Sequence, residues 1–93
     1  MEYSILRVDK FFKLSRIIKR RTEAKKACDS NSVKVNDKIA KAGDDIKPQD
    51  KIKIFFRHKV LEIEVLEIPI GNVSISDSSR LYRIIKEEKK SID

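Results

Sequence analysis

The feature that most constrains the fold is a change of hydrophobic period near residue 30. Before it, apolar residues recur three or four positions apart, as at Val8, Phe11 and Phe12, which is the spacing of an amphipathic helix. After it, apolar residues alternate with charged ones, as at Ile52 and Ile54, which is typical of a strand with one buried face. A chain of 93 residues suffices for one small domain with one core. Helices and strands must share that core, so the sequence predicts a single α+β domain.

The periodicity predicts two N-terminal helices packed on a small antiparallel sheet of short strands. Thr22 is the predicted N-cap of the second helix, and a basic linker over residues 16–21 joins the two. Two strands form a hairpin with Arg57, His58 and Lys59 at its tip. The predicted bounds are residues 8–15 and 23–29 for the helices, and 33–35, 39–40, 51–56 and 61–65 for the strands.

The C-terminal region is predicted to hold one more helix. Leu81, Ile84 and Ile85 recur at helical spacing, so the pattern predicts a C-terminal helix over residues 80–89. The predicted domain organisation is residues 1–68 for the compact domain and 69–93 for a linker and a helical tail.

Positive charge is concentrated in about one fifth of the chain. Residues 7–26 hold nine Lys or Arg against two acids, Asp9 and Glu23. The rest of the chain holds thirteen basic and thirteen acidic residues, so the whole net charge of +7 lies in this segment. A charge that served solubility alone would be spread over the surface. A localised one indicates a field directed at an anionic partner.

Residue types needed for catalysis or metal binding are scarce. His58 is the only histidine and lies at the predicted hairpin tip, where a histidine is usually a solvated turn residue. Cys28 is the only cysteine and falls on the inner face of the second helix, as a small buried hydrophobe does. One Cys and one His cannot build a zinc site, and two glycines form no phosphate-cradling loop. We therefore expect no enzymatic activity and no cofactor.

The expected location is the cytoplasm. No apolar run is long enough to span a bilayer, and the N-terminal residues MEYSILRVDK lack the apolar middle of a signal peptide. A lone cysteine forms no internal disulfide, which favours a reducing compartment. A membrane-surface helix is a weaker use of the basic segment, because the apolar side of that helix is committed to the core.

Structured RNA is the anionic partner that the pattern favours. The basic residues lie on a helix pair with its own apolar face, so a rigid support displays them. Four of the nine are arginines, whose planar guanidinium can bind two phosphate oxygens at once. The aromatic residues Phe11, Phe12 and Phe56 are assigned to the core, which leaves no obvious platform for stacking single-stranded bases. Recognition by backbone and shape is the expected mode.

A series of short motifs runs through residues 6–56. They are RVDKF at 7–11, SR at 15–16, KRRT at 19–22 and AK at 24–25, followed by VKVN at 33–36, AK at 40–41 and KPQD at 47–50. In order and spacing they resemble the S4 RNA-binding domain, which implies the S4-type (alpha-L) fold with residues 1–68 as the RNA-binding domain. The hairpin IKIFFRHKVLEIEVLEI and the tail LYRIIKEEKK extend the likeness to the ribosome-associated quality control protein P family of Gram-positive bacteria, which is related to Hsp15.

This resemblance implies a role on the ribosome. It implies binding, as a monomer, to the ribosomal RNA of obstructed large subunits and to the peptidyl-tRNA that they retain. It also implies support for C-terminal alanine tailing of the stalled chain, together with an alanine-tailing rescue factor on the same subunit. Residue by residue it assigns RNA contacts to Arg7, Lys10, Lys13, Arg16, Lys19, Arg20, Arg21 and Lys25.

Four further residues stand at characteristic family positions, and a structural role can be assigned to three of them. Asp9 is expected to favour the dipole of the first helix and to orient a nearby arginine. Asn31, Asp37 and Gln49 stand where the family commonly has turn glycines. Asn and Asp tolerate left-handed backbone, whereas Gln49 has no such explanation.

Other functions stay open on the sequence alone. An Hsp15-like recycling factor for blocked large subunits has almost the same features, although its tail is usually longer and more basic. A generic adaptor for structured RNA fits the charge pattern equally well. A protein-interaction adaptor would use the hairpin tip. An accessory domain of an RNA-modifying enzyme would require a catalytic domain that these 93 residues do not contain.

Overall fold

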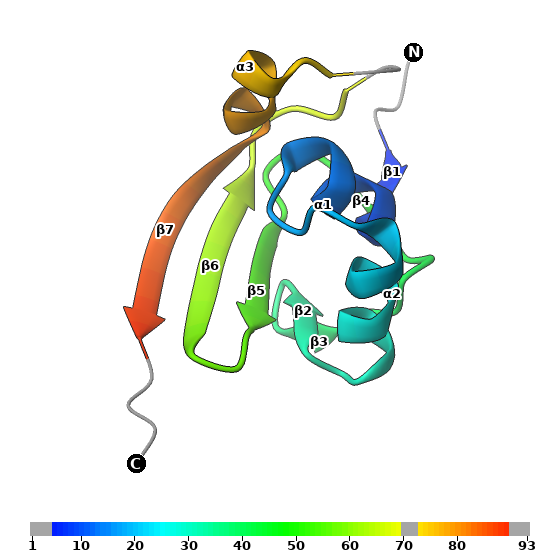
Figure 1. Ribbon diagram of the computed structural model, residues 1–93, viewed down its shortest axis with the longest axis vertical. Coiled ribbons are helices and arrows are strands. Elements are labelled where there is room, and N and C mark those ends of the chain that lie inside the picture. The colour runs from blue at the N-terminus through cyan, green and yellow to red at the C-terminus, as the bar shows by residue number, and fades with distance from the viewer. Residues whose placement is uncertain (1–4, 70–72, 90–93) are drawn as a thin grey trace.

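The computed structural model describes residues 5–69 and 73–89 (Figure 1). Two helices, α1 (Val8–Ser15) and α2 (Arg21–Asp29), precede most of the strands, and α3 (Ile75–Ser78) runs into a short 3-10 turn, η1 (Ser79–Leu81). The strands are β1 (Leu6–Arg7), β2 (Val33–Val35), β3 (Lys38–Ile39), β4 (Asp45–Ile46), β5 (Lys51–Phe55), β6 (Lys59–Val65) and β7 (Tyr82–Lys89).

Five strands form one antiparallel sheet in the order β3-β2-β5-β6-β7. Strands β1 and β4 form a separate two-residue pair, which was not predicted from the sequence. Helices α1 and α2 lie against one face of the large sheet, and β7 lies at its far edge (Figure 1). The predicted α+β class and the predicted hairpin are confirmed.

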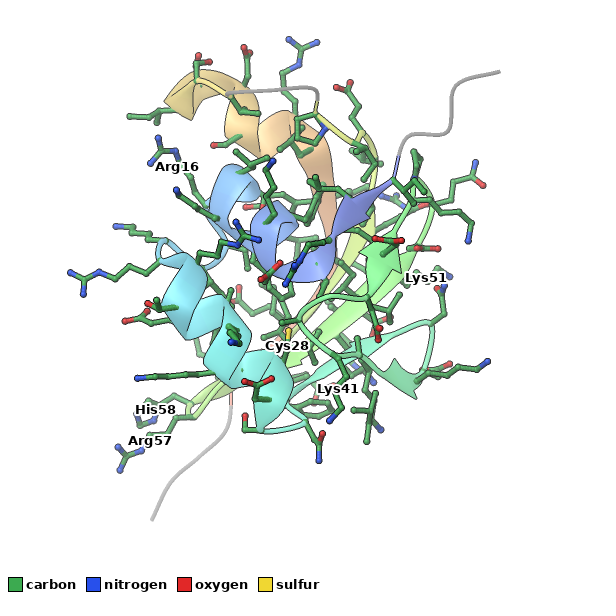
Figure 2. All side chains as sticks on the ribbon, turned by 90° about the vertical axis from the view of Figure 1, so that its right-hand side faces the viewer. Arg16, Cys28, Lys41, Lys51, Arg57 and His58 are labelled. Carbon is green, nitrogen blue, oxygen red and sulfur yellow. The ribbon has the colours of Figure 1, made fainter. Side chains whose placement is uncertain are left out.

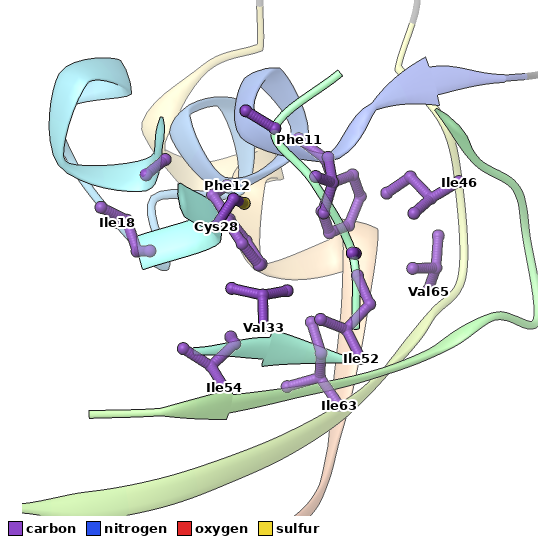
Figure 3. Close-up of a cluster of buried hydrophobic side chains, with 14 of the residues drawn as sticks. Phe11, Phe12, Ile18, Cys28, Val33, Ile46, Ile52, Ile54, Ile63 and Val65 are labelled. Carbon is purple, nitrogen blue, oxygen red and sulfur yellow. The ribbon is translucent and has the colours of Figure 1, made fainter. Parts of the chain in front are cut away.

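The core lies between the helix pair and the sheet (Figure 3). Phe11 and Phe12 of α1 pack with Val33 and Ile63 of the sheet, and all four side chains are fully buried. Burial of one such side chain contributes about 1.5–3 kcal/mol to folding. Cys28 is buried as predicted, and desolvation raises the pKa of its thiol to about 11. The thiol is therefore neutral at physiological pH.

Helix α1 has the predicted bounds but no side-chain cap. Its first amides instead donate to carbonyls of a distant loop: Val8 N to Asp44 O at 2.9 Å and Asp9 N to Ala42 O at 3.3 Å. At its other end, Arg16 adopts the left-handed conformation with φ 64° and donates its N–H to Lys13 O. The loop around residues 42–44 therefore closes the start of the helix.

Helix α2 begins two residues before the predicted start. The N-cap position is Arg20, which makes no side-chain capping bond, so the assignment of Thr22 as N-cap is wrong. The N–H of Ala24 donates to Arg20 O at 3.0 Å, which closes the first helical turn on Arg20. Thr22 therefore already lies inside the helix.

The predicted C-terminal helix over residues 80–89 is wrong. Among the described residues after Pro69, the helical segment is short and runs from Ile75 to Leu81, and Ser74 caps it by accepting from Asp77 N. Residues Tyr82–Lys89 form strand β7, which pairs with β6 along its whole length. Pairing with a neighbouring strand outweighs a short helical pattern, because local propensity is weak against tertiary contacts.

Positive φ angles occur where the sequence places non-glycine residues in turns. Asn31 has φ 63° and Asp37 has φ 70°, which confirms that both keep left-handed turns. Gln49 also has a positive φ of 79°. Left-handed backbone costs an L-residue roughly 1–2 kcal/mol. The hydrogen bond from Gln49 N to Val65 O, at 2.7 Å, helps to hold this conformation.

Candidate nucleic-acid interface

A buried carboxylate fixes two of the predicted RNA-contacting arginines. The side chain of Asp9 is only 3% exposed. Arg7 donates from Nε to Oδ1 at 3.2 Å and from Nη2 to Oδ2 at 3.3 Å. Arg21 donates from Nε to Oδ2 at 3.3 Å. The expectation that Asp9 orients a nearby arginine is confirmed, and the structure adds that it holds two.

Both arginines keep part of their guanidinium groups in solvent. Their side chains are 50% and 47% exposed for Arg7 and Arg21. Arginine has five N–H donors, and the bonds to Asp9 use two from Arg7 and one from Arg21. Gly43 flanks the first guanidinium: a Cβ at this position would lie 3.8 Å from Arg7 Cζ. Within the described residues, the remaining N–H donors of the two guanidinium groups make no hydrogen bond.

Helix α1 carries two further predicted contacts on its outer side. Lys10 and Lys13 are exposed, whereas Phe11 and Phe12 of the same helix are buried. Arg16 follows at the end of the helix, and Figure 2 shows its side chain pointing away from the body of the molecule. The apolar face of α1 therefore anchors a row of cations.

The basic linker between the helices is anchored by an apolar residue that sequence reasoning did not select. Ile18 is 8% exposed, and its N–H donates to Phe12 O at 3.3 Å. Lys19 and Arg20, which follow it, are both exposed. The signal was present in the sequence as an Ile17-Ile18 pair within an otherwise basic segment.

Three of the residues predicted to contact RNA line one hollow of about 260 Å³. Lys13, Arg16 and Lys19 line it together with Leu14 and Val73, and its lining residues in the described part of the chain include no acid. A hollow of this composition suits a phosphate with an attached apolar group.

The eight predicted residues thus form one basic helix surface with two centres. Arg7 and Arg21 meet at Asp9, and three others meet at the hollow. Lys25 on α2 is exposed and belongs to neither centre. Within residues 5–69 and 73–89, none of the following makes an ion pair with an acid: Lys10, Lys13, Arg16, Lys19, Arg20 and Lys25.

The described residues show no sign of a metal site or a membrane-spanning helix. No group of three or more His, Cys, Asp or Glu side chains there is placed to hold a metal ion. None of the described helices is long and apolar enough to cross a membrane. His58 lies at the hairpin tip and points outward beside Arg57 (Figure 2).

Comparison with known proteins identifies the family. The family model of the S4 domain matches residues 6–52 of this chain. The chain is 39% identical over 84 residues to the RQC P-site tRNA stabilizing factor of Bacillus subtilis, covering 90% of this chain and 96% of that protein. It is 42% identical over 84 residues to the Streptococcus pneumoniae factor of the same name, covering 90% and 94%.

A solved structure of low sequence identity shares the fold. Heat shock protein 15 of Vibrio cholerae superposes with a TM-score of 0.78 at 22% identity, covering 86% of this chain and 81% of that chain. The alignment with the curated relatives includes almost all of both chains. The chain therefore belongs to the S4 domain family and, within it, to the RQC P-site tRNA stabilizing factors.

Proposed function

We propose that this protein is a cytoplasmic, non-enzymatic RNA-binding factor of ribosome-associated quality control. It binds obstructed large ribosomal subunits as a monomer, through ribosomal RNA and the retained peptidyl-tRNA. The observation that carries the proposal is the basic helix surface, on which six cations have no acidic partner within the described residues. RNA phosphates are the ligand that neutralises such a surface.

The names of the relatives support the tRNA part of the proposal. Proteins 39–42% identical to this chain are called P-site tRNA stabilizing factors of RQC. On this chain we assign the contacts to the eight residues of the basic helix surface. By holding peptidyl-tRNA in place, the protein would support C-terminal alanine tailing of the stalled chain by a rescue factor on the same subunit.

The dependence of affinity on salt tests the RNA contacts directly. Each phosphate contact to duplex contributes about −0.9 to the slope of log affinity against log salt concentration. If about six of the eight residues contact phosphates, the slope is roughly −5. A slope near zero on an RNA hairpin would remove the electrostatic basis of the proposal.

The variant for binding tests should spare Arg7 and Arg21. Removing either arginine strips the buried Asp9 of an ion-pair partner, so loss of binding could reflect loss of folding. Lys10→Gln, Arg16→Gln and Lys19→Gln avoid this, because these residues make no ion pair among the described residues.

Sedimentation through a sucrose gradient tests the ribosomal role. We expect the tagged wild-type protein to move with free large subunits in lysate, more so under stress that splits stalled ribosomes. The triple variant should stay at the top of the gradient. If the wild-type protein follows small subunits or stays at the top, the family fold is present without the proposed ribosomal role.

Alanine tailing separates the proposal from simple subunit recycling. In cells that lack this protein, we expect stalled chains to lose their alanine tails, and the wild-type gene but not the triple variant to restore them. Normal tails together with accumulated blocked subunits would favour the Hsp15-like recycling function.

A further inference from the structure

The face of the large sheet that points away from α1 and α2 carries a ladder of charged side chains. Lys34 of β2 pairs with Lys53 of β5, which pairs with Glu62 of β6, and Glu62 pairs with Lys86 of β7. Residues directly opposite in antiparallel strands project from the same face. The ladder therefore crosses four strands on the side opposite the core.

On the β6–β7 half of this face, the glutamates form ion pairs with basic side chains. Arg83 donates to Glu64 across the strands, and Lys86 pairs with Glu88. Glu62 lies 4.0 Å from Nζ of Lys53, a separation at which an exposed ion pair contributes little. Acidic charge on this half is largely neutralised within the protein.

The lysines of the β2–β5 half are less neutralised, and within the described residues Lys53 has only the 4.0 Å contact with Glu62. In the described part of the chain, neither Lys34 nor Lys51 forms an ion pair. Nζ of Lys34 lies 5.8 Å from the centre of the Phe55 ring, which keeps the ammonium group over the sheet. Like charges directly opposite in a sheet are destabilising, so Lys34 and Lys53 repel each other in the free protein.

Lys34, Lys51 and Lys53 border one hollow of about 270 Å³, which also has Asp37 and Glu62 in its lining. Lys51 and Lys53 are two residues apart on β5, and so about 7 Å apart on one face. An anion in this hollow would be within reach of three ammonium groups and would relieve their repulsion. The hollow therefore suits a phosphate of a polyanion.

We propose that Lys34, Lys51 and Lys53 form a second RNA-binding surface, which holds the phosphate backbone of an RNA segment other than the one on the basic helix surface. The helix pair covers one face of the sheet (Figure 1). The lysines project from the other face, because they alternate along β2 and β5 with Val33, Ile52 and Ile54, which are buried in the core. One molecule thus joins two RNA segments. The inference rests on the proposed function, from which the RNA class of the partner is taken.

A bridging experiment tests this surface. A biotinylated RNA hairpin is tethered to beads, the protein is added, and capture of a second, fluorescent hairpin is measured. The sheet variant carries Lys34→Gln, Lys51→Gln and Lys53→Gln. A control with the same change of charge carries Lys38→Gln, Arg57→Gln and Lys89→Gln, which lie on neither surface and make no ion pair among the described residues. Light scattering verifies that each protein is monomeric at the concentration used.

We expect wild type and control to capture the second hairpin. The sheet variant should bind the tethered hairpin within about twofold of wild type, yet capture the second at least about tenfold less, as the loss of three phosphate contacts implies. Its melting temperature should change little, because the variant removes both the repulsion between Lys34 and Lys53 and the weak Lys53–Glu62 ion pair. Equal capture by the sheet variant overturns the second surface, and so does an equal loss of tethering and capture. Loss of capture to competing polyglutamate but not to excess hairpin would assign the surface to an acidic protein instead.

Refutation of the proposed function can be distinguished from refutation of this inference. If adding Lys10→Gln, Arg16→Gln and Lys19→Gln to the sheet variant leaves tethering normal, the basic helix surface is not an RNA-binding surface. If the combined variant stops tethering while the sheet variant both tethers and captures, only the second surface is refuted.

Discussion

The basic helix surface and strand β7 are both densely charged, yet they differ in where their acids lie. In residues 7–26 one acid, Asp9, is buried beneath the arginines, and most of the cations have no acidic partner among the described residues. In β7, the glutamates form ion pairs with lysines: Glu87 with Lys59 of β6 at 3.1 Å, and Glu88 with Lys86. Charge density alone therefore does not indicate a binding surface. The absence of internal neutralisation does.

The titration behaviour of β7 agrees with this difference. The hydrogen bond between Lys86 and Glu88 raises the pKa of the lysine and lowers the pKa of the glutamate. Each group thus stays charged over a wider pH range because the other is present. The two side chains satisfy one another in solvent and leave little net charge for a partner.

The largest expected contrast is in RNA affinity. The variant with Lys10→Gln, Arg16→Gln and Lys19→Gln should bind an RNA hairpin a few hundredfold more weakly at about 0.1 M salt, because three phosphate contacts are lost. The same change of charge on β7, by Arg83→Gln, Lys86→Gln and Lys89→Gln, should alter affinity by less than about threefold. Fluorescence anisotropy measures both. Equal losses would mean that total charge, not its placement, determines binding.

The next contrast concerns two isoleucines that face each other across β6 and β7. Ile63 is fully buried, whereas Ile84 is 53% exposed. Ile63→Ala should lower the free energy of unfolding by about 2–5 kcal/mol, through lost burial and a new cavity. Ile84→Ala should lower it by less than about 1 kcal/mol, because its side chain is half in water. Urea denaturation distinguishes them, and a large effect at Ile84 would show that β7 belongs to the core.

A smaller effect is expected from the buried acid of the helix surface. Asp9→Ala removes the acceptor of Lys10 N, at 2.8 Å, and the partner of two half-exposed arginines. We expect the free energy of unfolding to fall by about 1–3 kcal/mol. RNA affinity should also fall, since Arg7 and Arg21 lose their fixed orientation. Unchanged denaturation with normal RNA binding would show that Asp9 positions neither arginine.

The smallest effect is expected from the matching acid on β7. Glu87 and Lys59 are each about 40% exposed, so their ion pair is screened by water. Glu87→Gln should change the free energy of unfolding by less than about 0.5 kcal/mol. Thermal denaturation beside Asp9→Ala gives the comparison. If Glu87→Gln lowers the free energy of unfolding as much as Asp9→Ala does, the exposed ion pair of Glu87 stabilises the fold as strongly as the buried carboxylate of Asp9.

Much of the N-terminal half could be predicted because its signals are local. The apolar face of α1 has the helical period throughout, so Val8–Ser15 was predicted with its observed bounds. The start of α2 could not be predicted, because Arg20 occupies the cap position without any side-chain cap. The sequence predicted that Asp9 orients an arginine, but it did not say which one. Sequence spacing does not show that Arg7 and Arg21 meet at Asp9.

Strand β7 shows where local reasoning fails. Pairing with β6 shifts in register between Glu62 and Ile63, and the irregularity falls between Ile84 and Lys86 on the opposite strand. This shift breaks the strict alternation of a strand, and the adjacent isoleucines then imitate helical spacing. Short apolar runs are ambiguous between helix and strand unless the partner strand is known. The two-residue strands β1 and β4 are too short to leave any periodic signal.

The capping of α1 by the loop at residues 42–44 has a consequence for the order in which the protein is made. A helix of eight residues is not stable alone, and this one depends on carbonyls that are synthesised more than thirty residues later. A nascent chain that has emerged only as far as α2 already carries the nine basic residues of the segment, but not their arrangement. The specific surface is complete only once the loop has been synthesised and has docked. Until then the emerging chain offers the translating ribosome only unstructured charge.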